Sequence, residues 1–89
     1  MPPRRLGEDF DLLSEITDIE RIARGPSVRI RHHLNRRYAH GRRVTWLKRK
    51  GIALIQWRDS GQTEYAELHW FEAHGIGRVY VTYKRSLAR

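Results

Sequence analysis

The chain has 89 residues, enough for one domain, and a formal net charge of +8 at pH 7. Hydrophobic residues make up 39% of it, and no apolar run approaches the ~20 residues of a membrane-spanning helix, which excludes a membrane span. The absence of cysteine excludes disulfides and thiolate metal sites, whereas three Trp, four Tyr and two Phe argue against disorder.

The charge is unevenly distributed along the chain. Residues 1–28 carry a net −2 and residues 29–89 a net +10. Nine basic residues and no acidic residue fall between positions 29 and 50. Such a stretch repels itself unless anions neutralise it, and phosphate contacts do this well because they release condensed counterions. The stretch therefore predicts a nucleic-acid partner, with a merely solubilising surface as the alternative.

The first half of the chain predicts helices. Residues 1–7 are expected to be a flexible basic tail, and residues 8–87 a single α+β domain. Over residues 8–24, apolar side chains recur every three or four positions, which predicts a helix that Gly25 ends: Phe10, Leu13, Ile16, Ile19 and Ala23. A second helix is predicted over residues 26–40, with a strand at 28–32 as the competing interpretation.

From residue 42 onward the hydrophobic period changes to two, which predicts strands. The expected order is a short strand at 44–47, a basic turn at 48–51, and strands at 52–58, 63–71 and 78–85. Residues 59–62 are expected to form a hairpin turn and residues 72–77 a loop. The predicted fold is α+β, with two N-terminal helices packed on a three- to four-stranded antiparallel sheet. The alternative is a small SH3-like β-barrel with an N-terminal helix.

The chemistry that these residues favour is acid–base cleavage of a phosphodiester. RNA can be cleaved through its own 2′-hydroxyl by a base, an acid and fixed positive charge, without a metal or a protein nucleophile. The candidate catalytic residues are Glu67, His69, His74 and Tyr83. For each of them a purely structural role is the alternative. The histidines lack metal-binding spacing, so no metal and no cofactor is expected.

The candidate nucleic-acid-binding residues are basic side chains near aromatic residues on predicted strands or on the second helix. Aromatic rings interleaved with basic residues are typical of surfaces that bind single-stranded nucleic acid. The predicted contacts are Arg29, Arg36, Arg37, Arg42, Arg43, Lys48, Arg49, Lys50, Arg78, Lys84 and Arg85.

The layout resembles one known family. The predicted helices, the Trp-containing basic stretch 45–57 and the terminal Tyr83-Lys84-Arg85 resemble the RelE/ParE toxin superfamily, although that family usually opens with a strand. The resemblance implies cleavage of mRNA on the ribosome without a metal, and neutralisation by an antitoxin. It implies Glu67 or His69 as base and Tyr83 or His74 as acid. Phosphate-holding charge would come from Lys50, Arg78, Lys84 and Arg85.

The expected function is that of a basic, cytoplasmic RNA-binding protein, most specifically a metal-independent endoribonuclease of toxin type. The start of the chain lacks the apolar segment of a secretory signal, which favours the cytosol. One alternative is a non-catalytic module that binds RNA or the ribosome. Another is a small subunit whose basic face docks an acidic protein partner, such as an antitoxin.

Overall fold

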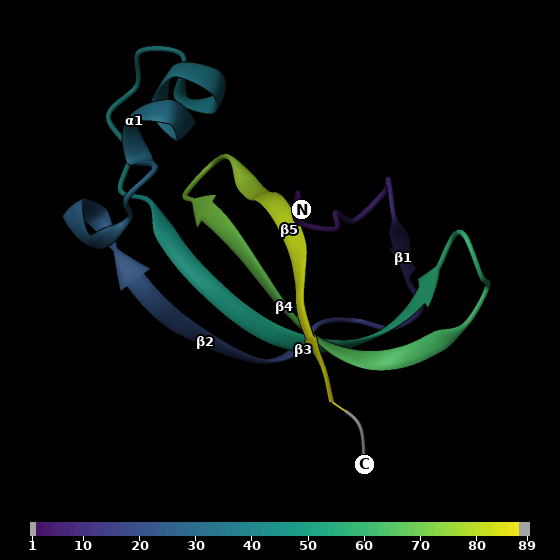
Figure 1. The fold of residues 1–89 in the computed structure, drawn as a ribbon. Coiled ribbons are helices and arrows are strands. Elements are labelled where there is room, and N and C mark those ends of the chain that lie inside the picture. Colours follow the sequence, from purple (N-terminus) through teal and green to yellow (C-terminus); the bar gives the residue numbers. More distant parts are fainter. Residues whose placement is uncertain (1, 88–89) are drawn as a thin grey trace.

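A curled antiparallel sheet dominates the computed structural model, which describes residues 2–87 (Figure 1). Its strands are β1 (Phe10–Leu12), β2 (Thr17–Arg24), β3 (Leu47–Trp57), β4 (Thr63–Ala73) and β5 (Gly77–Ser86). The strand order is β1-β3-β4-β5, and β2 also pairs with β3. β1 lies along the end of β3, with Phe10 opposite Trp57, and β2 along its beginning, with Thr17 opposite Ile52.

Three short helical turns fill residues 25–39, here called the helical segment. They are η1 (Gly25–Ser27), α1 (Arg31–Leu34) and η2 (Asn35–Ala39). The segment lies at the end of the sheet where β3 begins, and β1 lies at the other end (Figure 1). No helix within residues 2–87 has the length and apolar character needed to cross a membrane.

The molecule has two hydrophobic cores on opposite faces of the same sheet. Because side chains alternate along a strand, β4 directs Leu68 and Trp70 to one face, the inner face, and His69 and Phe71 to the other, the outer face. The inner-face core also contains Phe10, Ile16, Ala53, Ile55, Trp57 and Ala66. The second core lies under the helical segment and contains Val28, Leu34, Trp46 and Ala73, with Phe71 and Tyr80 packed against it.

The N-terminal residues complete the curl. The backbone of Leu6 donates to the carbonyl of Val81 (2.9 Å), and that of Tyr83 donates to the carbonyl of Arg4 (2.9 Å). Residues of the stretch expected to be a flexible basic tail thus bond to the free edge of β5, and Leu6 packs on the inner-face core. Residue 1 lies outside the described part of the chain.

The predicted α+β fold is wrong, most clearly over residues 8–24. This stretch forms β1 and β2, with a bend between them at which the backbone of Leu54 donates to Ser14 Oγ (2.9 Å). Phe10 and Ile16 are buried, but Leu13 and Ile19 are exposed, so the helix-like spacing is not one buried stripe. The sheet does curl into half a barrel, but the N-terminal helix expected with the alternative barrel is also absent from residues 2–24.

Two further elements differ from their predictions, and one agrees. Residues 26–40 form only the broken helical segment, in which α1 has four residues. The predicted basic turn at 48–51 lies instead within β3, where β2 and β4 pair with it from both sides. The hairpin turn at 59–62 is confirmed, with Gly61 at φ +75° and its backbone donating to the Trp57 carbonyl (2.8 Å).

Candidate functional site

Four charged or polar side chains meet on the outer face of the sheet. The outer-face cluster consists of Lys50 from β3, Glu67 and His69 from β4, and Arg85 from β5. The register accounts for their proximity: Lys50 is opposite His69, and Glu67 is opposite Arg85. Directly opposite residues of antiparallel strands point to the same face, so pairing of three strands gathers side chains that are up to 35 positions apart.

Glu67 is the centre of the outer-face cluster. It is buried, with 8% of its surface exposed, and both carboxylate oxygens are hydrogen-bonded. His69 Nε2 donates to Oε2 (2.8 Å), and Arg85 Nη2 donates to Oε1 (3.0 Å). The His69 hydrogen bond, and then the bond and charge of Arg85, hold the pKa of the Glu67 carboxylate below its usual range, against the effect of burial. An ionised, fully bonded carboxylate is a weak base but a good orienting group.

His69 is the residue of the outer-face cluster best placed to accept a proton. In the neutral ring, the hydrogen bond to the Glu67 carboxylate requires the proton on Nε2, and Nδ1 then has a lone pair. Within residues 2–87, no hydrogen bond reaches this Nδ1, and 17% of the side chain is exposed. This carboxylate–histidine pairing is the arrangement by which serine hydrolases orient a general base.

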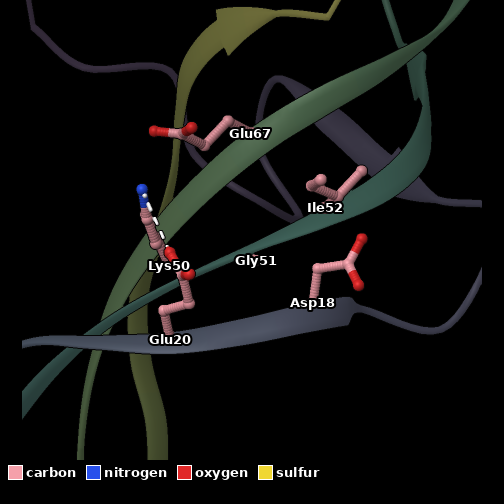
Figure 2. Close-up of a pocket in the computed structure, with 6 residues that line it drawn as sticks. All are labelled: Asp18, Glu20, Lys50, Gly51, Ile52 and Glu67. Atoms are coloured by element: carbon pink, nitrogen blue, oxygen red, sulfur yellow. Dashed lines mark ion pairs between the residues drawn. The ribbon is translucent and has the colours of Figure 1, made fainter.

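Lys50 provides fixed positive charge beside this pair. Its Nζ lies 3.2 Å from Glu20 Oε2 of β2. Figure 2 shows Lys50 and Glu67 extending toward one another at a cavity of about 170 Å³. The cavity is also lined by Asp18, Glu20, Gly51 and Ile52. Arg85 adds a second cation, and 64% of its side chain is exposed.

The other two candidate catalytic residues lie elsewhere. His74 is exposed in the turn between β4 and β5, at the end of the sheet near the helical segment. Tyr83 packs on the inner face, where its hydroxyl donates to Glu64 Oε1 (3.0 Å) and its ring meets Trp57 edge-on at 4.9 Å. Burial, followed by the Glu64 bond, raises the pKa of Tyr83, which weakens it as an acid. Neither residue joins the outer-face cluster.

The predicted nucleic-acid-binding residues divide between the two faces. An arginine-rich rim, exposed on the helical segment and the loop after it, is formed by Arg29, Arg36, Arg37, Arg42 and Arg43. Lys48 continues from this rim onto the outer face, with Nζ 5.7 Å from the centre of the Phe71 ring. Lys50 and Arg85 follow in the outer-face cluster. A basic path therefore runs from the helical segment to His69.

Arg49 and Arg78 face the other way. On the inner face, Arg49 Nε lies 3.3 Å from Glu72 Oε1, and the Arg78 guanidinium lies 5.0 Å from the centre of the Trp70 ring. Both arginines therefore lie on the opposite face of the sheet from the outer-face cluster. Lys84 is exposed at an irregularity of β5, where the register shifts between the partners of Glu67 and Leu68.

Sequence reasoning missed several residues of the outer face. Glu20 was assigned to a helix, although it lies on β2 opposite Lys50. His33 lies within the predicted second helix, but its Nε2 lies 2.8 Å from the hydroxyl of Tyr80 on β5. His33 and Tyr80 are 47 positions apart, and no local sequence pattern indicates such a contact. For Glu20, the alternation of acidic and apolar residues along 17–20 was an available strand signal.

Within the described residues 2–87, no group of three or more His, Asp or Glu side chains is arranged to hold a metal ion. Comparisons of the chain with protein-family models, curated proteins and solved structures found no match.

Proposed function

We propose that the protein binds RNA across its outer face and cleaves it at the outer-face cluster as a metal-independent endoribonuclease, acting in the cytoplasm. One observation carries the proposal: His69 is hydrogen-bonded to the buried, ionised Glu67, which Arg85 also binds, and Lys50 lies opposite His69 on β3. A base with an orienting carboxylate and two adjacent cations is what cleavage through the 2′-hydroxyl requires.

Each residue of the outer-face cluster has a role in the proposed reaction. His69 Nδ1 takes the proton of the 2′-hydroxyl, and the 2′-oxygen forms a bond to phosphorus. The bond from phosphorus to the 5′-oxygen breaks, and Lys50 gives that oxygen a proton. The products are a 2′,3′-cyclic phosphate and a 5′-hydroxyl, and solvent restores both side chains. Arg85 and Lys50 stabilise the additional negative charge of the transition state.

The arginine-rich rim has the role of holding the RNA backbone. Its five arginines are exposed, and the basic path leads from them to His69 through Lys48. Arginine suits this role because its planar fork matches phosphate oxygens with two hydrogen bonds. Contacts of this kind carry little sequence preference, so the proposal specifies RNA as a class of substrate and no particular sequence.

The test is cleavage of end-labelled RNA in EDTA, with and without ribosomes. Cleavage of all-RNA strands that leaves 2′,3′-cyclic phosphate ends, together with resistance of 2′-O-methyl strands, is the expected result. Cleavage of DNA or of 2′-O-methyl RNA would contradict the mechanism, because both lack the attacking hydroxyl. Cleavage only with ribosomes would favour the toxin-type form, whose neutralising partner would be an acidic antitoxin-like protein.

The same experiment separates the alternatives. Binding without cleavage in either arm would favour a non-catalytic module that associates with RNA or the ribosome. Absence of both binding and cleavage at ~150 mM salt, where exposed charges are screened beyond ~8 Å, would favour an acidic protein as the partner of the basic face.

A further inference from the structure

A second cavity lies on the outer face, between the helical segment and β5. Its volume is about 340 Å³, within the range of small-ligand sites. Its walls come from four parts of the chain and include Arg5, Ile30, His33, Phe71, Tyr80 and Thr82. Thr82 contacts the outer-face cluster through His69, and none of the lining residues named here belongs to that cluster.

The walls of this cavity combine aromatic, apolar and cationic groups. The His33 ring stacks on Tyr80 with 6.0 Å between ring centres and 16° between the planes. The Arg5 guanidinium lies 5.5 Å from the centre of the Tyr80 ring. Ile30 leaves 38% of its surface exposed at the cavity although it is a large apolar residue. Flat rings with an adjacent cation suit a flat aromatic ligand that carries negative charge.

The backbone of Tyr80 adds an independent observation. Tyr80 has φ +53°, in the left-handed region that a bulky side chain rarely adopts. It lies at an irregularity of β5, between the residues paired with His69 and with Phe71. Such a conformation is strained for a bulky residue, and strained residues of this kind cluster at ligand clamps and active sites. Here the irregularity brings the Tyr80 ring to the outer face, against His33.

The cavity lies next to His69. Thr82 lines the cavity and is directly opposite His69, to whose carbonyl its Oγ1 donates (3.3 Å). Phe71 lies two positions beyond His69 on the same face of β4, which places the two side chains about 7 Å apart. An extended RNA strand separates a phosphate from a neighbouring base by a similar distance.

We infer that this cavity binds one unpaired base of the RNA strand, next to the phosphate that His69 acts on. The inference rests on the proposed function, which it extends by naming a base subsite. Tyr80 and Phe71 supply the ring faces, Ile30 an apolar edge, and Arg5 the charge that meets the flanking phosphate. Because stacking uses the face that every base has, the subsite prefers a base over no base and discriminates weakly among the four.

The experiment measures binding of a fluorescein-labelled 2′-O-methyl oligouridine, which the enzyme cannot cleave, and of an abasic strand of the same length. Tyr80→Ala is expected to weaken oligouridine binding about 5- to 150-fold, the loss for one base stack. It is expected to leave abasic binding within about twofold. Tyr80→Phe keeps the ring and is expected to bind oligouridine like the wild type.

A matched pair of aliphatic variants keeps the test independent of Tyr80. Ile30→Ala removes apolar surface at the cavity and is expected to weaken oligouridine binding about threefold to tenfold. Ile19→Ala removes the same atoms from an equally exposed residue on β2, outside the cavity, and is expected to have no effect. This pair decides the outcome if Tyr80→Ala does not fold.

Two results would overturn the inference. If the wild type binds both strands and neither Tyr80→Ala nor Ile30→Ala lowers oligouridine affinity relative to abasic affinity, the base subsite is wrong while RNA binding stands. If the wild type binds neither strand even at low salt, the proposed function and the subsite both fail.

Discussion

Glu67 is an acidic residue between two fully buried neighbours on β4, Ala66 and Leu68. A carboxylate in such a position is costly unless its oxygens are satisfied, and here His69 and Arg85 bind both. Removing one partner of a buried charged hydrogen bond typically costs more than the net value of the bond. Glu67 is therefore expected both to stabilise the fold and to orient His69 in the proposed reaction.

This link predicts a pH-dependent effect of Glu67→Gln. The folded state lowers the pKa of Glu67, so its stabilisation is complete above the unfolded value of about 4.3 and is lost as pH falls through the lower folded value. We expect Glu67→Gln to lower the free energy of unfolding by about 1.5–3 kcal/mol at pH 7, and by clearly less at pH 3, in urea titrations.

The control for this prediction is Glu20→Gln. Glu20 is mostly exposed and pairs with Lys50 at the surface, where such pairs contribute about 0–1 kcal/mol. Equal destabilisation by Glu67→Gln at pH 7 and pH 3 would show that the charge of Glu67 is not what stabilises the sheet.

Tyr83 gives a second prediction at this scale. Because its hydroxyl is bonded to Glu64 on the inner face, Tyr83→Phe is expected to cost about 1 kcal/mol of stability and to leave the rate of RNA cleavage within about twofold. Urea titration and a single-turnover cleavage assay measure the two effects. A large loss of cleavage with unchanged stability would restore Tyr83 as the acid.

At the scale of elements, the strands after residue 52 were predictable and the N-terminal third was not. Alternation along 52–58 and 63–71, with the Gly61 turn between them, is a local signal for a hairpin. Over residues 8–24, the spacing of apolar residues favours a helix, and pairing of β1 and β2 with β3 overrides it. Three β-branched residues of this stretch suit a strand: Ile16, Thr17 and Ile19. The outcome depends on contacts with β3, which lies more than 20 positions away.

The candidate site was also only partly predictable from the sequence. Glu67 and His69 lie two positions apart on one strand, so their common face followed from alternation alone. Adding Lys50 and Arg85 required the register of β3 and β5, and excluding Tyr83 required knowing where β5 shifts register. Residue types therefore suggested the proposed chemistry, but only the pairing of strands determined which of these residues meet.

Gly51 provides the test of this pairing. A Cβ at Gly51 would lie 2.5 Å from Ile16 Cγ2 and 3.0 Å from both the Thr17 carbonyl oxygen and Trp70 Cη2. The missing side chain lets β2 begin close to β3 above the inner-face core. Gly51→Ala is expected to lower the free energy of unfolding by about 1–3 kcal/mol, measured by urea titration.

The control for this substitution is Gln62→Ala in the exposed turn, which is expected to change stability by less than about 0.5 kcal/mol. Gly51→Ala with wild-type stability would mean that β2 does not approach β3 as closely as described.

For the whole molecule, the second core covers the outer face under the helical segment, and the outer-face cluster lies beyond that core on the same face. Binding of RNA at the rim predicts a steep salt dependence, because each phosphate contact releases condensed counterions. Arg36→Ala and Arg42→Ala are each expected to reduce the slope of log K against log salt by about one contact. Arg58→Ala is the control, because Arg58 is paired with Asp11 (2.7 Å) at the other end of β3. An equal change in all three variants would show that the rim is not the interface.

The central claim is that His69 cleaves RNA which the basic surface holds. The most direct measurement compares wild type, His69→Ala and His74→Ala for both gel shift and cleavage of end-labelled RNA in EDTA. His74 is the control because it is an exposed histidine outside the outer-face cluster. We expect His69→Ala to lose at least ~10²-fold in cleavage, the usual contribution of a general base, with affinity nearly unchanged, and His74→Ala to retain both. Full cleavage by His69→Ala, or equal loss in the two variants, would contradict the claim.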